Sequence, residues 1–260
     1  MPTPQPAHLP NGATVLVALV DLRKEHRLWG WLRIAQGASS LGEIAGLRFV
    51  KVMGSGHGGG FGLRPSASHQ GLVCVFDSRA QAQAFVDGPV FAQYRTRARE
   101  LCFGLFGIQS SRGAWDGVSW APQAADAAAG QGSGGPATPG LVAAITRASI
   151  FPTKAAAFWR MAPAAQAQLP QAQGCLVSMG LGEAPLLRQC TFSIWRDAAA
   201  MDAYARSGAH SKAIAAAYRN GFFSESMFVR MQVLGFAGVW DGKPVNLGST
   251  AAPTAALAEA

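Results

Sequence analysis

Short apolar runs of strand length alternate along this chain with segments of helical periodicity. Such runs, bounded by glycine, proline or polar residues, are typical of half-buried strands, and apolar positions three and four apart are typical of amphipathic helices. The first half is predicted to form strands over 13–20, 47–53, 71–76 and 101–109, helices over 28–38, 78–86 and 89–99, and a glycine-rich loop over 54–62. The second half is predicted to form strands over 141–150, 174–179, 187–195 and 227–234, and helices over 153–161, 197–205 and 209–218. Ser78 and Asp197 are residue types that cap helix N-termini.

Three sequence matches relate the two halves. Trp115-Asp116-Gly117 recurs as Trp240-Asp241-Gly242, 125 residues later (240 − 115), and Met53-Gly54 recurs as Met179-Gly180 at an offset of 126 (179 − 53). As a third match, Val75-Phe76-Asp77-Ser78 and Ile194-Trp195-Arg196-Asp197 each precede a predicted helix, at an offset of 119 (194 − 75). Matches in the same order indicate a duplicated domain, and each copy reads β-α-β-β-α-β, the ferredoxin-like order. The predicted class is therefore α+β, with two tandem ferredoxin-like repeats packed as a dimeric α+β barrel within one chain.

A change of composition separates the two repeats. Residues 121–140 read APQAADAAAGQGSGGPATPG, with one charged residue and no apolar periodicity, which is typical of a flexible linker. The repeats are therefore expected over 13–120 and 141–247. The Pro-rich residues 1–12 and the Ala-rich residues 248–260 are expected to be disordered ends.

The overall composition fits a folded protein with a sizeable core. Of 260 residues, 49% are hydrophobic and 14% charged, and 22 Lys and Arg against 14 Asp and Glu give a formal net charge of +8. This composition excludes wholesale disorder. No apolar run reaches the roughly 18–20 residues of a membrane-spanning helix, and the N-terminus lacks a secretory signal pattern, so we expect a cytoplasmic protein. The dispersed arginines form no basic stripe for nucleic acid. Their positive charge would suit peripheral contact with an anionic inner membrane, and a high arginine content without a specific partner is the competing interpretation.

His210 is the candidate metal ligand among the five histidines. It lies on a predicted amphipathic helix, and Ala213, Ile214 and Ala217 follow on the same face. These small neighbours leave room beside the imidazole for a flat, bulky group. At an offset of 119 the other repeat has Phe91 instead, which predicts one site per chain. A lone imidazole suits the axial position of haem iron better than a site that needs several ligands, and a purely structural histidine is the competing interpretation.

Other motifs give weaker signals. The segment Gly54 to Gly60 contains a GxGxxG spacing after a predicted strand, but no helical pattern follows, so a hairpin loop or substrate lid is favoured over a nucleotide site. The four cysteines have no zinc spacing, and neither HExxH nor GxSxG occurs. Most aromatic residues are expected in the core, and some, such as Trp159 and Phe192, are candidates to line a long apolar pocket.

Seven short segments, spread in order over about residues 13–245, resemble one protein family. They are Val52 to Gly56 with Gly60-Phe61, Ser110 to Gly117, Ala144 to Ala148, Phe158-Trp159, Gly182 to Pro185, Thr191 to Trp195, and Gly208 to Ile214. Together they resemble the spheroidene monooxygenase family, the acyclic carotenoid 2-ketolases of purple photosynthetic bacteria.

That resemblance implies a reaction and its cofactors. The family oxidises C-2 of acyclic carotenoids such as spheroidene with O₂, by successive hydroxylations to a ketone. The resemblance implies haem b, with electrons from a reduced ferredoxin-type donor. It also implies a fold similar to haem-binding dimeric α+β barrel proteins such as chlorite dismutases and aldoxime dehydratases. In those proteins the proximal histidine lies on a helix of the C-terminal half and the distal residues lie on the facing sheet.

The resemblance also suggests roles for particular residues. His210 is the histidine placed like the proximal ligand, with Ala213 and Ile214 beside the cofactor. Arg147 and Gln189 are the candidate catalytic residues on the distal side. Three other interpretations stay open: a haem-dependent dehydratase or peroxidase-like enzyme, a non-catalytic haem- or carotenoid-binding module, and a cofactor-free monooxygenase on the same fold.

Overall fold

A computed structural model describes residues 7–60, 62, 64–121, 140–160, 168–184, 186–206 and 208–248. The predicted linker over 121–140 and tail over 248–260 lie almost entirely outside the described residues, as do residues 1–6 of the predicted N-terminal segment. The described part of that segment is ordered differently from the prediction. β1 (Ala7–His8) pairs with β6 (Val118–Ser119), and Leu9 is buried.

Eight antiparallel strands close into a barrel, so the protein is of the α+β class. Their order is β10-β5-β2-β4-β3-β8-β9-β7, and β7 pairs back to β10. A ninth strand, β11 (Lys243–Leu247), pairs with the end of β10 outside the barrel. The barrel strands are β2 (Thr14–Leu22), β3 (Leu47–Gly56), β4 (Pro65–Phe76), β5 (Ala98–Gly113), β7 (Val142–Ile150), β8 (Cys175–Ala184), β9 (Arg188–Trp195) and β10 (Phe223–Trp240).

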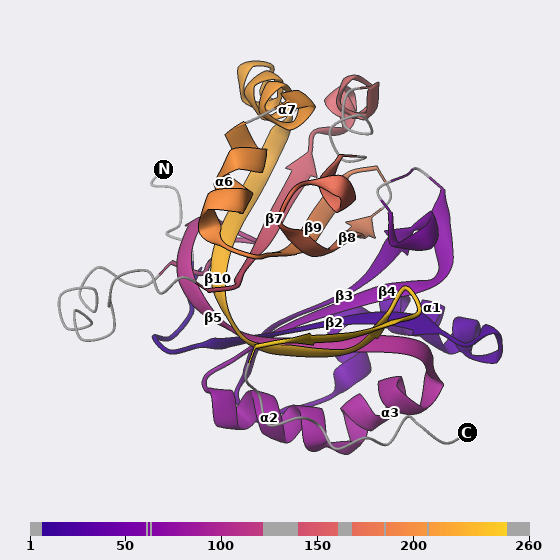
Figure 1. Cartoon of the computed structure of the whole chain (residues 1–260). Coiled ribbons are helices and arrows are strands. Elements are labelled where there is room, and N and C mark those ends of the chain that lie inside the picture. Colours follow the sequence, from indigo (N-terminus) through magenta and orange to yellow (C-terminus); the bar gives the residue numbers. More distant parts are fainter. Residues whose placement is uncertain are drawn as a thin grey trace.

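Helices cover the barrel on two opposite outer faces (Figure 1). The helices are α1 (Arg27–Gln36), α2 (Arg79–Asp87) and α3 (Pro89–Arg97) in the first half and α6 (Ala198–Arg206) and α7 (Gly208–Arg219) in the second. Residues 155–160 are also helical, and short 3-10 turns span Lys24–His26, Gly37–Leu41, His57–Gly59, Pro152–Lys154 and Leu169–Gln171. Within the described residues, no helix has both the length and the apolar character to cross a bilayer.

The two predicted helix caps are confirmed. The Ser78 hydroxyl accepts a hydrogen bond from the Gln81 amide at 3.4 Å, and the Asp197 carboxylate accepts one from the Ala200 amide at 2.7 Å. Each side chain satisfies an amide that the first helical turn leaves without a backbone partner. The caps therefore fix where α2 and α6 begin, directly after β4 and β9.

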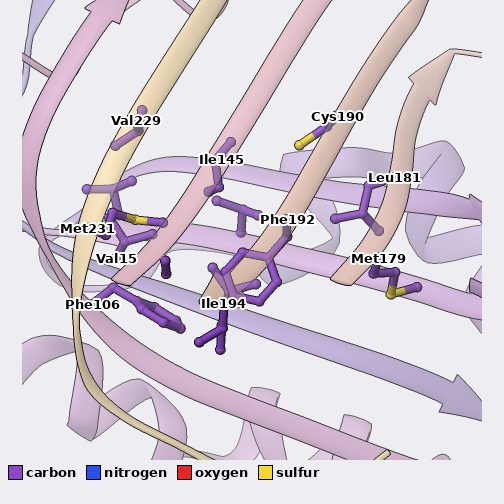
Figure 2. Packing of buried hydrophobic residues seen from close by; sticks show 14 of the residues in the cluster. Val15, Phe106, Ile145, Met179, Leu181, Cys190, Phe192, Ile194, Val229 and Met231 are labelled. Carbon is purple, nitrogen blue, oxygen red and sulfur yellow. The ribbon is translucent and has the colours of Figure 1, made fainter. Parts of the chain in front are cut away.

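The barrel interior is a packed apolar core rather than a channel. Inward-facing side chains from all eight strands meet there, and Figure 2 shows Phe106, Phe192 and Ile194 among them. The rings of Phe106 and Phe192 lie 5.5 Å apart, centre to centre, and both side chains are fully buried. A long substrate has no space inside such a barrel, so a site for one must lie outside the barrel core.

The two halves follow the same strand order. The first half is ordered β5-β2-β4-β3 and the second β10-β7-β9-β8, which is the fourth, first, third and second strand of each half. The Trp-Asp-Gly turns also match, because Asp116 and Asp241 both adopt left-handed backbone with φ of 50° and 51°. The Gly117 amide donates to Glu225, and the Gly242 amide donates to Glu100, 125 residues earlier (225 − 100).

Several element boundaries differ from prediction because the barrel supplies partners that local sequence does not reveal. β4 begins at Pro65 rather than at 71, since β3 pairs with it as a hairpin up to Gly56. β10 runs from Phe223 to Trp240 rather than over 227–234, because β7, β5 and β11 pair with successive parts of it. The helix predicted to end at 99 ends at Arg97, where β5 starts. The glycine-rich segment forms this hairpin and is followed by a strand, which agrees with the predicted hairpin loop.

Candidate functional site

His210 lies near the start of α7, stacked on an aromatic side chain of α6. The imidazole and the Tyr204 ring are 4.6 Å apart at an interplanar angle of 26°, and Tyr204 in turn packs against Trp195 of β9 at 5.3 Å. Burial lowers the pKa of the His210 imidazole below its usual value of about 6.5. The ring is therefore neutral at pH 7, with a nitrogen lone pair available to a metal.

The first half of the chain has large aromatic side chains at the equivalent place. α6 and α7 begin 119 residues after α2 and α3 (198 − 79 and 208 − 89). At this offset Phe91 corresponds to His210 and Tyr94 to Ala213. Phe91 and Tyr94 are fully buried, and Phe91 packs on Phe103 at 4.9 Å. The second half thus has an imidazole and a methyl group where the first has two large rings.

The outer face of the sheet in the second half also differs from its counterpart in the first half. Strand pairing aligns Ala18 and Leu72 of the first half with Thr146 and Thr191 of the second. Ala18 and Leu72 are buried beneath the helices, whereas Thr146 is exposed and Thr191 half-buried. The outer face of β7 and β9 is therefore uncovered at a point where the equivalent face of the first half is closed, and it carries hydroxyl groups there.

Open surface pockets adjoin the C-terminal end of α7. One, of about 530 Å³, is lined by Thr153, Lys154, Ala157, Arg160, Asn220 and Phe222. A second, of about 200 Å³, is lined by Ala217, Tyr218, Gly221, Phe223, Ser224, Glu225 and Ser226. Apolar side chains of α7 also face solvent, with Ile214 and Tyr218 both exposed. This helix therefore presents an imidazole, small residues and apolar side chains along an open edge of the second half.

The structure brings some of the predicted site residues to this side of the sheet. His210, Ala213 and Ile214 all lie on α7, where His210 and Ala213 are half-buried. Gln189 is on the outer face of β9, two residues from Thr191, and is half-buried beside Gly182. Trp159 lies among helical residues, and its indole donates to the Leu186 carbonyl at 2.8 Å.

Phe192 is on the opposite face of the same strand. Successive side chains of a strand alternate between its faces, so the outward position of Gln189 and Thr191 places Phe192 in the barrel core. There it packs against Phe106 and against Phe236 at 5.9 Å. Its full burial in that core separates it from the surface pockets at α7.

Arg147 also points inward and ends in a network of carboxylates at one mouth of the barrel. Its guanidinium pairs with Glu225, with Asp116 at 3.2 Å and with Glu183 at 3.5 Å, and its side chain is 1% exposed. Lys51 pairs with Asp116 and with Glu183, and the Trp115 indole donates to Glu183 at 2.7 Å. The structure does not bring Arg147 to the side of the sheet that carries Gln189 and α7, because it alternates with the outward-facing Thr146 along β7.

Sequence reasoning singled out neither Tyr204, Thr146 nor Thr191 as site residues. One signal was available for Tyr204, since Phe85 corresponds to it at the offset of 119 (204 − 85) and packs against Phe91 at 5.8 Å. The threonines gave no such signal, because only the register of the barrel shows which residues of the first half they replace.

Comparison with known proteins places the chain in a family. No protein-family model matches the sequence. The chain is 48% identical over 235 residues to spheroidene monooxygenase of Rubrivivax gelatinosus, covering 90% of this chain and 87% of that protein. It is 37% identical over 201 residues to spheroidene monooxygenase of Rhodobacter capsulatus, covering 76% and 80%.

Solved structures support the fold. An aldoxime dehydratase complexed with butyraldoxime superposes with a TM-score of 0.53 at 10% identity, covering 88% of this chain and 83% of that one. A second aldoxime dehydratase structure gives 0.52 at 11% identity, covering 85% and 81%. At such identities the likeness concerns the fold alone, whereas the sequence matches span most of both chains. The chain belongs to the spheroidene monooxygenase family.

Proposed function

We propose that this protein is a haem-dependent, O₂-dependent monooxygenase that introduces a C-2 keto group into acyclic carotenoids of the spheroidene type. Membership of the spheroidene monooxygenase family supports the substrate class. The contrast between the halves carries the cofactor proposal, because His210 and Ala213 stand where Phe91 and Tyr94 fill the first half. Compared with the first half, the second half lacks two large rings and has one neutral imidazole. This difference gives a flat metal-containing ligand both space and a nitrogen ligand.

His210 would hold the cofactor by its imidazole, and the residues around it would shape the site. Haem b supplies the activation of O₂. Stacking on Tyr204 fixes the plane of the imidazole, and the short side chain of Ala213 leaves room beside it. Ile214 and Tyr218 offer apolar surface to the substrate. Since the barrel core is filled, the carotenoid would lie along α7 rather than inside the barrel.

We propose that the polar groups of the sheet act on the side facing α7. Gln189 donates and accepts hydrogen bonds through its amide, and Thr191 and Thr146 do so through their hydroxyls. Gln189 would orient O₂ or hold a water that passes protons to it. Electrons would come from a reduced ferredoxin-type protein, as the family resemblance implies.

We also propose that the two halves are tandem ferredoxin-like repeats with a single site. The shared strand order and the matching Trp-Asp-Gly turns support a duplication. Further support comes from the shifts in strand register. One lies in the pairing of β2 with β5, at Asp21/Leu22, and the other lies at the equivalent place in the pairing of β7 with β10, at Phe223/Glu225. One repeat then kept an aromatic core beneath its helices and the other opened to a ligand.

A haem titration of the purified protein tests the proposed function. The wild type is expected to bind one haem per chain with a strong Soret band, and to convert spheroidene to a ketone only with haem, O₂ and reductant together. A Soret band without any ketone would favour a dehydratase or peroxidase-like enzyme or a non-catalytic haem-binding module. Ketone formed equally well by haem-free protein would contradict the cofactor proposal.

Replacing Gln189 by leucine separates turnover from cofactor binding. The variant is expected to keep the Soret band and to form ketone about ten- to a hundredfold more slowly, because one positioned hydrogen-bonding group is lost. Cys190→Ser is a control on the neighbouring, inward-facing position, and it is expected to keep most of its turnover per bound haem. Unchanged ketone formation by Gln189→Leu would remove Gln189 from the site.

A further inference from the structure

Helix α1 carries an apolar stripe on the face turned to solvent. Leu28, Trp31 and Leu32 are 73%, 45% and 51% exposed, and Ala35 continues the stripe one turn later. The spacing of three, four and seven residues puts all four on one face of the helix. A surface helix of a globular protein normally turns its polar side to water. This stripe is therefore a surface that needs a partner.

The helix cannot rotate to bury this stripe in its own fold. A Cβ atom at Gly30 would lie 2.2 Å from Leu22 and 2.3 Å from Gln70, so the opposite face of α1 is pressed onto the sheet. The Trp29 ring packs edge-on against Tyr94 at 5.0 Å, and Arg33 donates to Gln93 at 2.6 Å. These contacts to α3 and to the sheet hold Leu28, Trp31 and Leu32 outward.

Positive charge surrounds the stripe. Arg23, Lys24 and Arg27 precede it in the turn that leads into α1, and Arg33 and Arg97 both lie over the Trp29 ring, at 4.8 and 4.9 Å. None of these five cations forms an ion pair with another described residue. Glu25 is the acidic residue within this turn and helix. The surface thus combines exposed leucine and tryptophan side chains with a cationic margin.

We propose that α1 docks the protein on an anionic lipid bilayer. Leucine and tryptophan side chains insert at the boundary between headgroups and acyl chains, where tryptophan is enriched, and the cations at the margin bind lipid phosphates. A second copy of this chain fits the surface less well. A symmetric contact would set two surfaces of the same positive charge against each other, with like-charge repulsion.

Vesicle flotation tests this proposal without haem or carotenoid, so its failure is distinct from failure of the proposed function. The wild type is expected to float with vesicles of phosphatidylglycerol and phosphatidylcholine, and weakly with phosphatidylcholine alone. The variant Leu28→Gln/Trp31→Gln/Leu32→Gln is expected to lose at least about a hundredfold in affinity. Arg23→Gln/Lys24→Gln is expected to bind about fivefold more weakly per cation removed, and raised salt is expected to weaken the wild type.

Two controls keep the test specific. Leu176 is also 45% exposed but lies on β8 in the other half, and Leu176→Gln is expected to float like the wild type. Brominated lipids are expected to quench fluorescence of the wild type but to quench Trp31→Phe much less. Wild type that floats with neither vesicle, or a folded stripe variant that floats unchanged, would overturn the proposal. A wild-type dimer that the stripe variant converts to monomer, without vesicle binding, would assign the stripe to a second copy instead.

Discussion

Ala213→Tyr is expected to abolish haem binding while leaving the fold intact. The phenol would occupy the space that Tyr94 occupies in the first half, where that ring is fully buried. A cofactor beneath α7 needs the same space, so haem affinity is expected to fall at least about a hundredfold, more than about 2.7 kcal/mol. The measurement is a haem titration followed by the Soret band, with a thermal melt of the haem-free protein to show that the variant folds.

A matched control is available on the same helix. Ala215 is exposed on α7, two residues further on, so Ala215→Tyr is expected to bind haem like the wild type. His210→Gly removes the ligand instead of the space, and added imidazole is expected to restore its Soret band but not that of Ala213→Tyr. Full haem binding by Ala213→Tyr would show that the cofactor does not lie beside this residue.

Arg147→Ala is expected to lower the free energy of unfolding by about 3–5 kcal/mol. The guanidinium is 1% exposed and bridges carboxylates from the Trp-Asp-Gly turn, β8 and β10. Removing it leaves Glu183 and Glu225 facing each other across a partly buried space without their shared cation. Urea denaturation of the haem-free protein measures the change. Arg48→Ala, which breaks the exposed pair with Asp77, is expected to leave stability almost unchanged.

The same network makes a prediction about acid. Burial alone would raise the pKa of Asp116, but the hydrogen bond and charge of Lys51, with the charges of Arg147 and Arg188, outweigh it and lower that pKa. The stabilisation is therefore complete above the unfolded value of about 3.9 and is lost as the pH falls through the lower folded value. Arg147→Ala is expected to weaken this acid dependence. Lost turnover per bound haem with unchanged stability would instead return Arg147 to a catalytic role.

Local sequence was sufficient for the order of the elements. Periods of two and of 3.6 residues are set by backbone geometry within one strand or helix, and the caps at Ser78 and Asp197 are local contacts, so all eight barrel strands and the helices are predictable from the sequence alone. The likeness of the two halves was also visible, because the Trp-Asp-Gly turns need their left-handed aspartate and glycine in both halves. The singling out of His210 came from the same comparison of the halves.

Only the tertiary structure showed which face of each strand lines the barrel core. On β7 the core-facing side chains include Arg147 and the outward-facing ones include Ala144 and Thr146, so its pattern of apolar and polar residues does not say which face lines the core. The two-residue period already puts Phe192 and Gln189 on opposite faces of β9, whereas only the register of the barrel shows that Arg147 lies on the core side with Phe192. Likewise, Thr146 and Thr191 became site candidates only through the register that aligns them with Ala18 and Leu72, since register depends on hydrogen bonds between strands distant in sequence.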